Sequence, residues 1–272
     1  MNWTIAVAGT ALLAAFGAGL YMTDLPKPAV AVAEPAAVAR ADGTATTLDA
    51  LDRETLHAEI RGYILGNPDI IMEAVALLEN RRVADAAAAE RQMLRELQAE
   101  IWDDGFSWVG GNPDGDITLV EFLDYQCGFC KRAHDGVMGM VADDGNIRLI
   151  VKEYPILGPV SESASRATLA VLADQGDALY EAFGDALMRF PGRLDDVQID
   201  RIAERSGVDV VAMRARMDDR DISEQIARNR ELARRLEITG TPTFILDETF
   251  IRGFLPREEM EEAVRLARSA AR

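Results

Sequence analysis

The pattern of apolar and polar positions changes character near residue 116. Residues 49–103 have helical periodicity, whereas the later part alternates short apolar runs of strand type with helical segments. The elements predicted for this later part are, in order, a strand at 117–123, a helix to about 141, a strand at 147–154, a helical block at 161–235, two short strands around Asp247-Glu248 and a helix at about 256–271. This order predicts an α/β fold, in which an all-helical domain is inserted into a small sheet at about 160–236.

Two helices are predicted within residues 49–104, separated at Gly66-Asn67-Pro68-Asp69. Their apolar residues form one narrow stripe, made of Leu51, Leu56, Ile60, Ile64, Ile71, Val75, Leu78, Val83, Ala87, Leu94, Leu97 and Ile101. Such a stripe is buried either against the rest of its own chain or against copies of the same helix. The Ala/Pro-rich linker at 24–48 and the Gly/Asn/Pro/Asp-rich stretch at 104–116 favour a separate helical stalk that forms an oligomer.

The first 23 residues form a separate apolar segment. It runs without a charge from about Thr4 to Met22, which is near the length that spans a bilayer as a helix. No Lys or Arg precedes it, and Ala31-Val32-Ala33 offers a cleavage site of small residues. We therefore expect residues 1–23 to be a cleaved signal peptide or a membrane anchor, with a buried core helix as the alternative. Either form of export places the rest of the chain outside the cytoplasm.

The charge of the chain limits its partners. It carries 29 Lys and Arg against 46 Asp and Glu, a net charge of −17, and has no basic cluster interleaved with aromatic residues. This composition argues against nucleic acid as a partner and fits basic or neutral client proteins better. The apolar fraction of 49% is enough to build a core, so wholesale disorder is not expected.

The chain has two cysteines, Cys127 and Cys130, and both lie in the stretch EFLDYQCGFCK. Disulfides therefore do not hold the fold together. Structural zinc needs four ligands, and only His57 and His134 could join the two cysteines, so neither a metal site nor a cofactor is expected. His134 is expected to be an exposed helix residue. Binding of Cu(I) by the two thiolates stays open as an alternative use of the pair.

A C-x-x-C pair at the start of a helix is suited to thiol–disulfide exchange. Unpaired backbone N–H groups and the helix dipole stabilise a thiolate at Cys127, which we expect to be the nucleophile. Cys130, one turn inside the helix, is expected to be buried and to resolve the mixed disulfide. Gly128 leaves room above the attacking sulfur, and Phe129 supplies an apolar contact surface for the substrate.

Two further features are assigned to the same site. Glu121 interrupts the apolar strand before the dithiol, and we expect a buried carboxyl group that moves a proton to or from Cys130, with Lys152 as its charge partner. The alternative is that Glu121 faces solvent. Thr241-Pro242 begins a later strand, and a cis peptide bond there would turn the Thr241 backbone toward a docked, extended substrate. A plain turn proline is the alternative.

Together these motifs resemble the DsbA family of thioredoxin-fold proteins. The resemblance covers about residues 105–272, and it rests on the strand with Glu121, Cys-Gly-Phe-Cys, the EYPILGP turn, the helical block and Gly-Thr-Pro-Thr-Phe. It implies a thioredoxin fold with a helical insertion, Cys127 as the attacking thiol, Cys130 as the resolving thiol and a cis Pro242. The segment GYILGNPDIIMEAVALLE is similar to the N-terminal oligomerisation region of ScsC-like proteins.

The chain departs from the oxidases of that family at two places. Gly128-Phe129 stands where those proteins typically have Pro-His, and Thr241 stands where they have Val. Both choices look more like the isomerases of the DsbC kind, and the loss of the His predicts a less oxidising pair.

The sequence therefore predicts an exported, periplasmic protein thiol–disulfide oxidoreductase that acts as a disulfide isomerase or reductase. Its expected partners are cysteine-containing exported client proteins, a membrane redox partner and copies of itself bound through residues 49–104. A DsbA-like disulfide oxidase is the nearest alternative, and a periplasmic copper-handling module is an alternative of another class.

Overall fold

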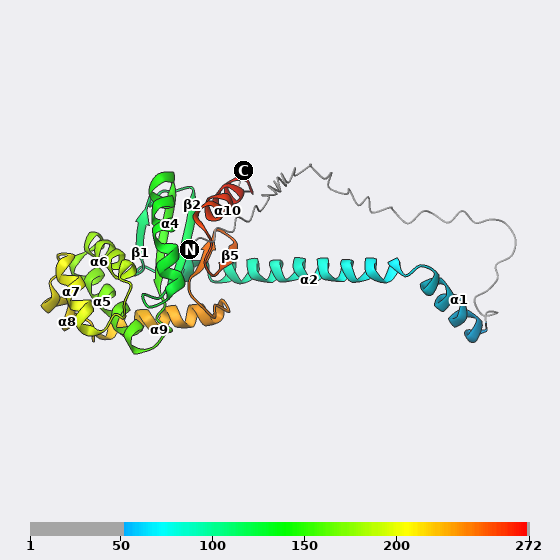
Figure 1. Cartoon of the computed structure of the whole chain (residues 1–272), viewed down its shortest axis with the longest axis horizontal. Coiled ribbons are helices and arrows are strands. Elements are labelled where there is room, and N and C mark those ends of the chain that lie inside the picture. The colour runs from blue at the N-terminus through cyan, green and yellow to red at the C-terminus, as the bar shows by residue number, and fades with distance from the viewer. Residues whose placement is uncertain (1–51, 271–272) are drawn as a thin grey trace, which may run out of the picture. The chain divides into compact units, whose positions relative to one another are not determined.

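The computed structural model describes residues 52–270, which divide into two compact units between Gly66 and Asn67. The described part of the first unit is the helix α1 (Arg53–Gly66). The elements of the second unit are α2 (Asp69–Glu96), α3 (Gln98–Trp102), β1 (Trp108–Gly111), β2 (Ile117–Leu123), α4 (Gly128–Asp144), β3 (Ile147–Glu153), α5 (Pro159–Gln175), α6 (Asp177–Arg189), α7 (Asp196–Arg205), α8 (Val210–Arg216), α9 (Arg220–Arg235), β4 (Thr243–Leu246), β5 (Thr249–Arg252) and α10 (Arg257–Ala270) (Figure 1).

The predicted N-terminal signal or anchor at 1–23 and the linker at 24–48 lie outside the described residues. Among residues 52–270, no helix has both the length and the apolar composition that crossing a membrane requires.

The five strands form one mixed sheet in the order β1-β3-β2-β4-β5. Strands β2 and β3 run parallel and are connected by α4, whereas β4 and β5 form an antiparallel hairpin next to β2. Helices α5 to α9 lie between β3 and β4 in the chain, where the helical insertion was predicted. Helices α5 to α8 gather at one side of the sheet, and α9 runs back along it (Figure 1). The predicted thioredoxin fold with an inserted helical domain is therefore confirmed.

Strand β1 was not predicted. It lies within residues 104–116, which the sequence suggested to be a connection, and it pairs antiparallel with β3 at the edge of the sheet. Its two glycines are required by close packing. A Cβ atom at Gly111 would collide with the Ile147 carbonyl group, and one at Gly110 would collide with the Trp108 ring. The glycine-rich composition here reflects close approach of other groups and not a linker.

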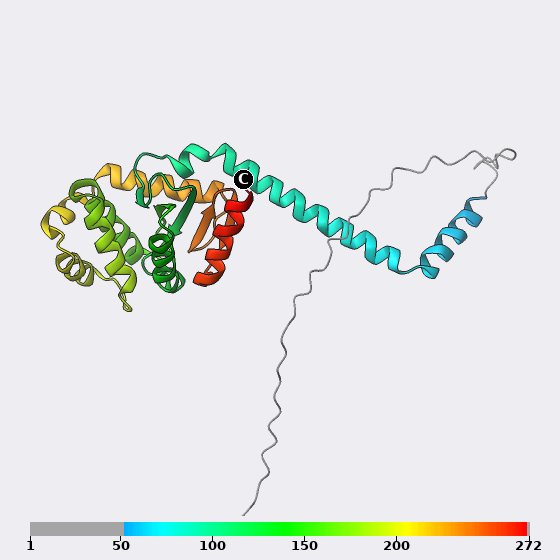
Figure 2. The same cartoon turned by 90° about the horizontal axis from the view of Figure 1, so that it is seen from above.

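Apolar side chains cover both faces of the sheet, so that the sheet lies between two layers of helices (Figure 2). On one face Leu119 and Leu123 belong to a core shared with α4, α10 and the inserted helices α5 to α8. On the other face Val120 and Phe122 pack with the end of α2, with α3 and with α9. Because successive strand residues point to opposite faces, each position of β2 is assigned to one of these two layers.

The apolar stripe of the N-terminal helices divides between two environments. Its last members, Leu94, Leu97 and Ile101, are buried in the core under the sheet. We call the sheet and the helices packed on it the head. Its core includes residues before position 105, where the domain boundary was predicted. The large apolar members of α1 and of the first half of α2 are mostly exposed: Leu56, Ile60, Ile71, Val75, Leu78 and Val83.

Candidate active site

The two cysteines lie at the start of α4, directly after β2. Cys127 occupies the N-cap position with an extended backbone, and Cys130 is one turn inside the helix. Both are free thiols, with Cys127 7% exposed and Cys130 fully buried. Between them Gly128 is exposed and has open space at its Cα, and the Phe129 ring is 53% exposed. The predicted burial of Cys130 is thus confirmed, and an open, partly apolar surface surrounds the outer sulfur.

Hydrogen bonds lower the pKa of the Cys127 thiol to about 5. The largest contribution is the hydrogen bond from the Cys130 thiol, which outweighs the opposing effect of burial. The Thr241 side chain and the backbone N–H groups of Phe129 and Cys130 stabilise the thiolate further. Because an unperturbed cysteine titrates near 8.5, Cys127 is almost entirely a thiolate at neutral pH, which is the nucleophilic form.

The Thr241-Pro242 peptide bond is cis, as predicted, and it lies against the dithiol. The Cys127 Sγ atom is 3.1 Å from the Thr241 carbonyl oxygen, to which it donates a hydrogen bond in the thiol form. On the far side of the loop, the Gly253 N–H group donates to the Pro242 carbonyl oxygen at 2.9 Å. Two segments far apart in the sequence therefore form a single surface at the outer sulfur.

Glu121 is buried and lies on the face of the sheet that packs against α4. Burial raises the pKa of its carboxyl group to about 8, and the nearby charges of Glu153 and Cys127 add to this effect. The pKa of Cys130 is also raised, first by burial, then by its hydrogen bond to Cys127 and by the charge of Glu121. The alternative of a solvent-facing Glu121 is therefore wrong. The carboxyl group and the buried thiol are close enough to influence each other's protonation.

Lys152 is not the partner of Glu121, contrary to the prediction. It pairs in register with Phe122, so its side chain points to the opposite face of the sheet. There its ammonium group is 2.5 Å from an Asp104 carboxylate oxygen and 2.8 Å from the Glu100 carbonyl oxygen. Burial lowers the pKa of Lys152, which the charge of Asp104 partly offsets. The ion pair connects the loop after α3 to the sheet and takes no part in the dithiol site.

His134 is also placed differently from the prediction. Its side chain is only 11% exposed, and its Nε2 atom is 2.9 Å from an Asp185 carboxylate oxygen. It connects α4 to α6 of the helical insertion, because both helices cover the same face of the sheet.

A second buried carboxylate, Glu153, was not predicted. It accepts hydrogen bonds from the hydroxyl groups of Tyr125 and Tyr180 at 2.8 Å, Ser165 at 2.7 Å and Thr168 at 3.0 Å. Burial raises its pKa to about 7, although these four donors act in the opposite direction. Once the register of β2 and β3 is known, the two-residue period of the strands shows that position 153, and not 152, shares a face with Glu121.

Asp124 is a second residue that the sequence prediction missed. Its buried carboxylate accepts hydrogen bonds from three backbone N–H groups, those of Gln126 at 2.8 Å, Ile156 at 2.9 Å and Leu157 at 3.0 Å. Its carbonyl oxygen accepts from the Cys127 N–H group at 3.0 Å. Asp124 thus connects the start of α4, where the dithiol lies, to the loop after β3.

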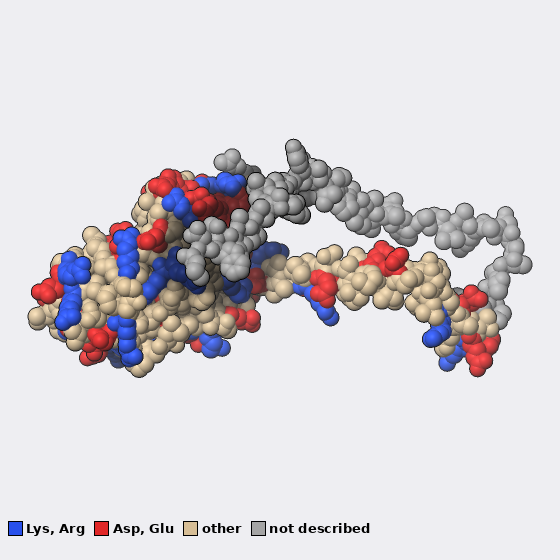
Figure 3. Space-filling model, in the orientation of Figure 1, with Lys and Arg blue, Asp and Glu red and all other residues tan. Residues whose placement is uncertain are grey.

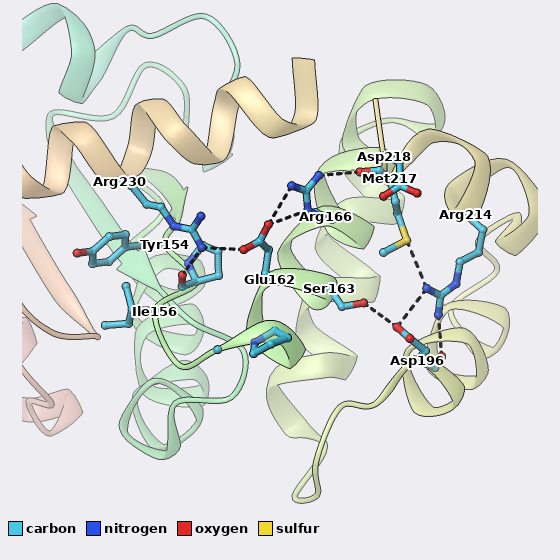
Figure 4. Close-up of a pocket in the computed structure, with 13 residues that line it drawn as sticks. Tyr154, Ile156, Glu162, Ser163, Arg166, Asp196, Arg214, Met217, Asp218 and Arg230 are labelled. Atoms are coloured by element: carbon cyan, nitrogen blue, oxygen red, sulfur yellow. Dashed lines mark hydrogen bonds and ion pairs between the residues drawn. The ribbon is translucent and has the colours of Figure 1, made fainter. Parts of the chain in front are cut away.

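A groove of about 910 Å³ begins at that loop and continues between α5, α8 and α9 (Figure 4). Five of its charged side chains form ion pairs with one another. Glu162 lies between Arg166 at 2.9 Å and Arg230 at 3.0 Å, and Asp196 is 3.3 Å from Arg214. The groove offers polar and apolar surface next to the loop that Asp124 holds, without an unpaired charge among these five residues.

Comparisons with known proteins agree with this geometry. A family model described as "DSBA-like thioredoxin domain" matches residues 118–265. A thioredoxin-like oxidoreductase from Silicibacter pomeroyi is similar with a TM-score of 0.60 at 37% identity, and the match covers 63% of this chain and 97% of that one. The catalytic domain of Proteus mirabilis ScsC is similar with a TM-score of 0.61 at 26% identity, covering 65% of this chain and 97% of that one.

Similarity to curated sequences extends to part of a larger protein. The Na(+)/H(+) antiporter NhaA 3 of Salinispora tropica is 27% identical over 205 residues, which cover 75% of this chain. The same match covers 31% of the antiporter, so the chain spans about a third of the length of that relative.

Proposed function

Because the chain belongs to the DSBA-like thioredoxin domain family, we propose that it is an exported protein thiol–disulfide oxidoreductase that acts by exchange at Cys127 and Cys130. The observation that carries this proposal is the outer thiol. Its pKa is lowered to about 5, it lies beside the cis Thr241-Pro242 bond, and the thiol of Cys130 lies one turn behind it.

The proposed exchange has two steps. The Cys127 thiolate attacks one sulfur of a client disulfide, a mixed disulfide forms, and the other client sulfur leaves as a thiolate. Either a client thiol or Cys130 then attacks the mixed disulfide; the first route isomerises the client and the second reduces it. Cys130 must lose its proton before it attacks. Glu121, with a pKa near 8, has the proton affinity of a general base that works close to neutral pH.

The pKa of Cys127 is intermediate between those of a strong oxidase and of thioredoxin. Thiolate stabilisation favours the reduced pair, so a lower pKa goes with a more oxidising protein. The outer cysteine has a pKa of about 3.5 in DsbA and about 7 in thioredoxin. The value near 5 for Cys127 lies between them.

The exposed apolar residues of α1 and α2 support an oligomer. Ile71, Val75 and Leu78 lie three or four positions apart on α2, and each is about half exposed or more. A helix with such a stripe is stabilised when it pairs with a copy of itself. Facing dithiols in an oligomer would hold a misfolded client between them, which an isomerase requires.

Two ribonuclease assays test the direction of exchange. We expect the reduced protein to recover activity from scrambled ribonuclease faster than the oxidised protein activates reduced ribonuclease, and Cys127→Ser to abolish both. Faster oxidation of reduced ribonuclease would favour an oxidase. If neither substrate is turned over while Cu(I) is bound tightly, the proposed activity is wrong.

The role of the oligomer is tested by charge on the exposed stripe. The triple variant Ile71→Glu, Val75→Glu, Leu78→Glu should be a monomer in light scattering and should lose isomerase activity while it keeps reductase activity. Val211→Glu, at an exposed apolar position of α8, is the matched control and should change neither property. A monomeric triple variant that still isomerises would contradict the proposed role of the oligomer.

A further inference from the structure

An unneutralised positive charge lies beside the dithiol. Arg132 is exposed on α4, and no carboxylate of residues 52–270 forms an ion pair with it. The acidic residue one turn further along the helix, Asp135, is 2.9 Å from Arg189 instead.

Two aromatic rings hold the Arg132 side chain in place. Its guanidinium carbon lies 4.3 Å from the centre of the Phe129 ring and 5.5 Å from that of Phe254. Phe129 is part of the C-x-x-C motif, and Phe254 follows Gly253, which is hydrogen-bonded to Pro242. The stack therefore bridges the dithiol helix and the cis-proline loop.

The two ring contacts restrict the guanidinium group but leave its charge available. A cation–π contact takes up no anion, so the N–H donors of the guanidinium group can still bind a carboxylate. Both rings are also accessible, with Phe129 53% and Phe254 38% exposed. Restricting the side chain in advance lowers the entropy cost of binding a ligand group.

Arginines elsewhere on the second unit are commonly paired with carboxylates. The three arginines of the groove in Figure 4 contact Glu162 or Asp196. On the face of the second unit visible in Figure 3, basic side chains are interspersed with acidic ones. Arg132 thus differs from the groove arginines in having its anion-binding edge open, next to the nucleophile.

We propose that Arg132, held between Phe129 and Phe254, binds an acidic side chain next to the reacting cysteine of a client polypeptide and so favours acid-flanked client disulfides. The proposal rests on the proposed exchange at Cys127. The planar fork of arginine matches a carboxylate. The overall negative charge opposes acidic clients only at long range, where salt screens it beyond about 10 Å at 0.1 M, whereas Arg132 acts at contact.

Peptide substrates test this preference. Each peptide carries one cysteine in a mixed disulfide with neutral pyridine-2-thiol, flanked in one peptide by Asp and Glu and in the other by Asn and Gln. We expect the second-order rate constant of the reduced wild type, measured in a single turnover at about 0.1 M salt, to favour the acidic peptide about threefold, the scale of a surface ion pair. The preference should disappear in Arg132→Gln and shrink in high salt for the wild type. Arg201→Gln, at an exposed arginine of α7 that has no ion pair within residues 52–270, is the matched control and should keep it.

A further variant distinguishes charge recognition from apolar contact. Phe254→Ala keeps the charge but removes one ring, and it should reduce the preference for the acidic peptide. If its rates fall equally on both peptides, or if Arg132→Gln keeps the preference, the proposal is wrong. Equal wild-type rates on the two peptides would also overturn it while leaving thiol exchange intact. Failure to turn over even the neutral peptide would instead contradict the proposed function.

Discussion

Replacing Thr241 with valine removes a hydroxyl group that stabilises the Cys127 thiolate, while the size of the side chain and the backbone carbonyl group are kept. A hydrogen bond to a charged group contributes about 1.5–3 kcal/mol, and one pKa unit corresponds to about 1.4 kcal/mol. We therefore expect the pKa of Cys127 to rise from about 5 to about 6 or somewhat higher.

The same change should make the pair more reducing. A depressed pKa means that the reduced protein is stabilised at neutral and high pH, and that this stabilisation is lost as the pH falls through the folded-state pKa near 5. At pH 7 a rise of one pKa unit weakens the stabilisation of the reduced form about tenfold. This lowers the reduction potential by about 30 mV for a two-electron couple. For the wild type, a pKa two units below that of thioredoxin stabilises the reduced form about 50-fold at pH 7, which predicts a potential near −220 mV against about −270 mV for thioredoxin.

Two measurements check this reasoning. Thiolate absorbance followed against pH gives the pKa, and equilibration with glutathione buffers gives the potential. Thr243→Val is the matched control, because that hydroxyl donates to the Gly240 carbonyl oxygen at 2.8 Å and not to the dithiol. The reasoning is refuted if Thr241→Val leaves the pKa within a few tenths of the wild-type value, or if both variants shift it equally.

Three further substitutions test buried groups by urea unfolding. Asp124→Ala deprives three N–H groups of their acceptor and should lower the free energy of unfolding by about 3 kcal/mol. Asp124→Asn keeps an acceptor oxygen and should cost less. Equal losses in the two variants would argue against the acceptor role. Glu121→Gln should leave the free energy of unfolding unchanged near pH 4 and raise it above pH 8. In the wild type, protonated Glu121 stabilises the fold by about 5 kcal/mol below its unfolded-state pKa near 4.5, and this stabilisation is lost as the pH rises through about 8. Parallel pH profiles of the two proteins would contradict this. Lys152→Met should cost about 3 kcal/mol, because the partly buried Asp104 carboxylate loses its cation and keeps only hydrogen bonds from Phe106 and Ser107. The added change Asp104→Asn should restore part of the loss; no recovery would mean that the pair is not coupled.

The parts of the site that the sequence predicted correctly are encoded in short stretches. The spacing of Cys127 and Cys130 at the start of a helix is enough to predict an outer, activated thiol and an inner, buried one. The cis bond before Pro242 was instead expected from the resemblance to the DsbA family, because a proline at the start of a strand is equally compatible with a plain turn. The prediction for the cysteines needed only the conformation of a few neighbouring residues.

The missed and misplaced residues depend on contacts between distant segments. Glu153 accepts hydrogen bonds from hydroxyl groups on the inserted helices, and Asp124 accepts them from backbone amides of the loop after β3. The error about Lys152 has another cause. In the register of β2 and β3, Lys152 and Glu121 point to opposite faces of the sheet, so Glu121 cannot be its ion-pair partner. Register, however, is a property of the pairing between strands and cannot be found from one strand alone.

Helical periodicity predicts the apolar stripe of α2 and α3 but not where the core of the head begins. The stripe from Ile71 to Ile101 is interrupted only at Glu90, and its spacing does not tell which members face the sheet and which stay exposed. The structure buries Leu94, Leu97 and Ile101, and Asp104 adds the carboxylate that pairs with Lys152. A head cut at residue 105 would lose all of these. Removing one large buried side chain costs about 2–5 kcal/mol, and a domain is stable by only about 5–15 kcal/mol. Loss of activity in such a truncation would therefore report unfolding, and the oligomer is better tested by substitutions on the exposed first half of α2.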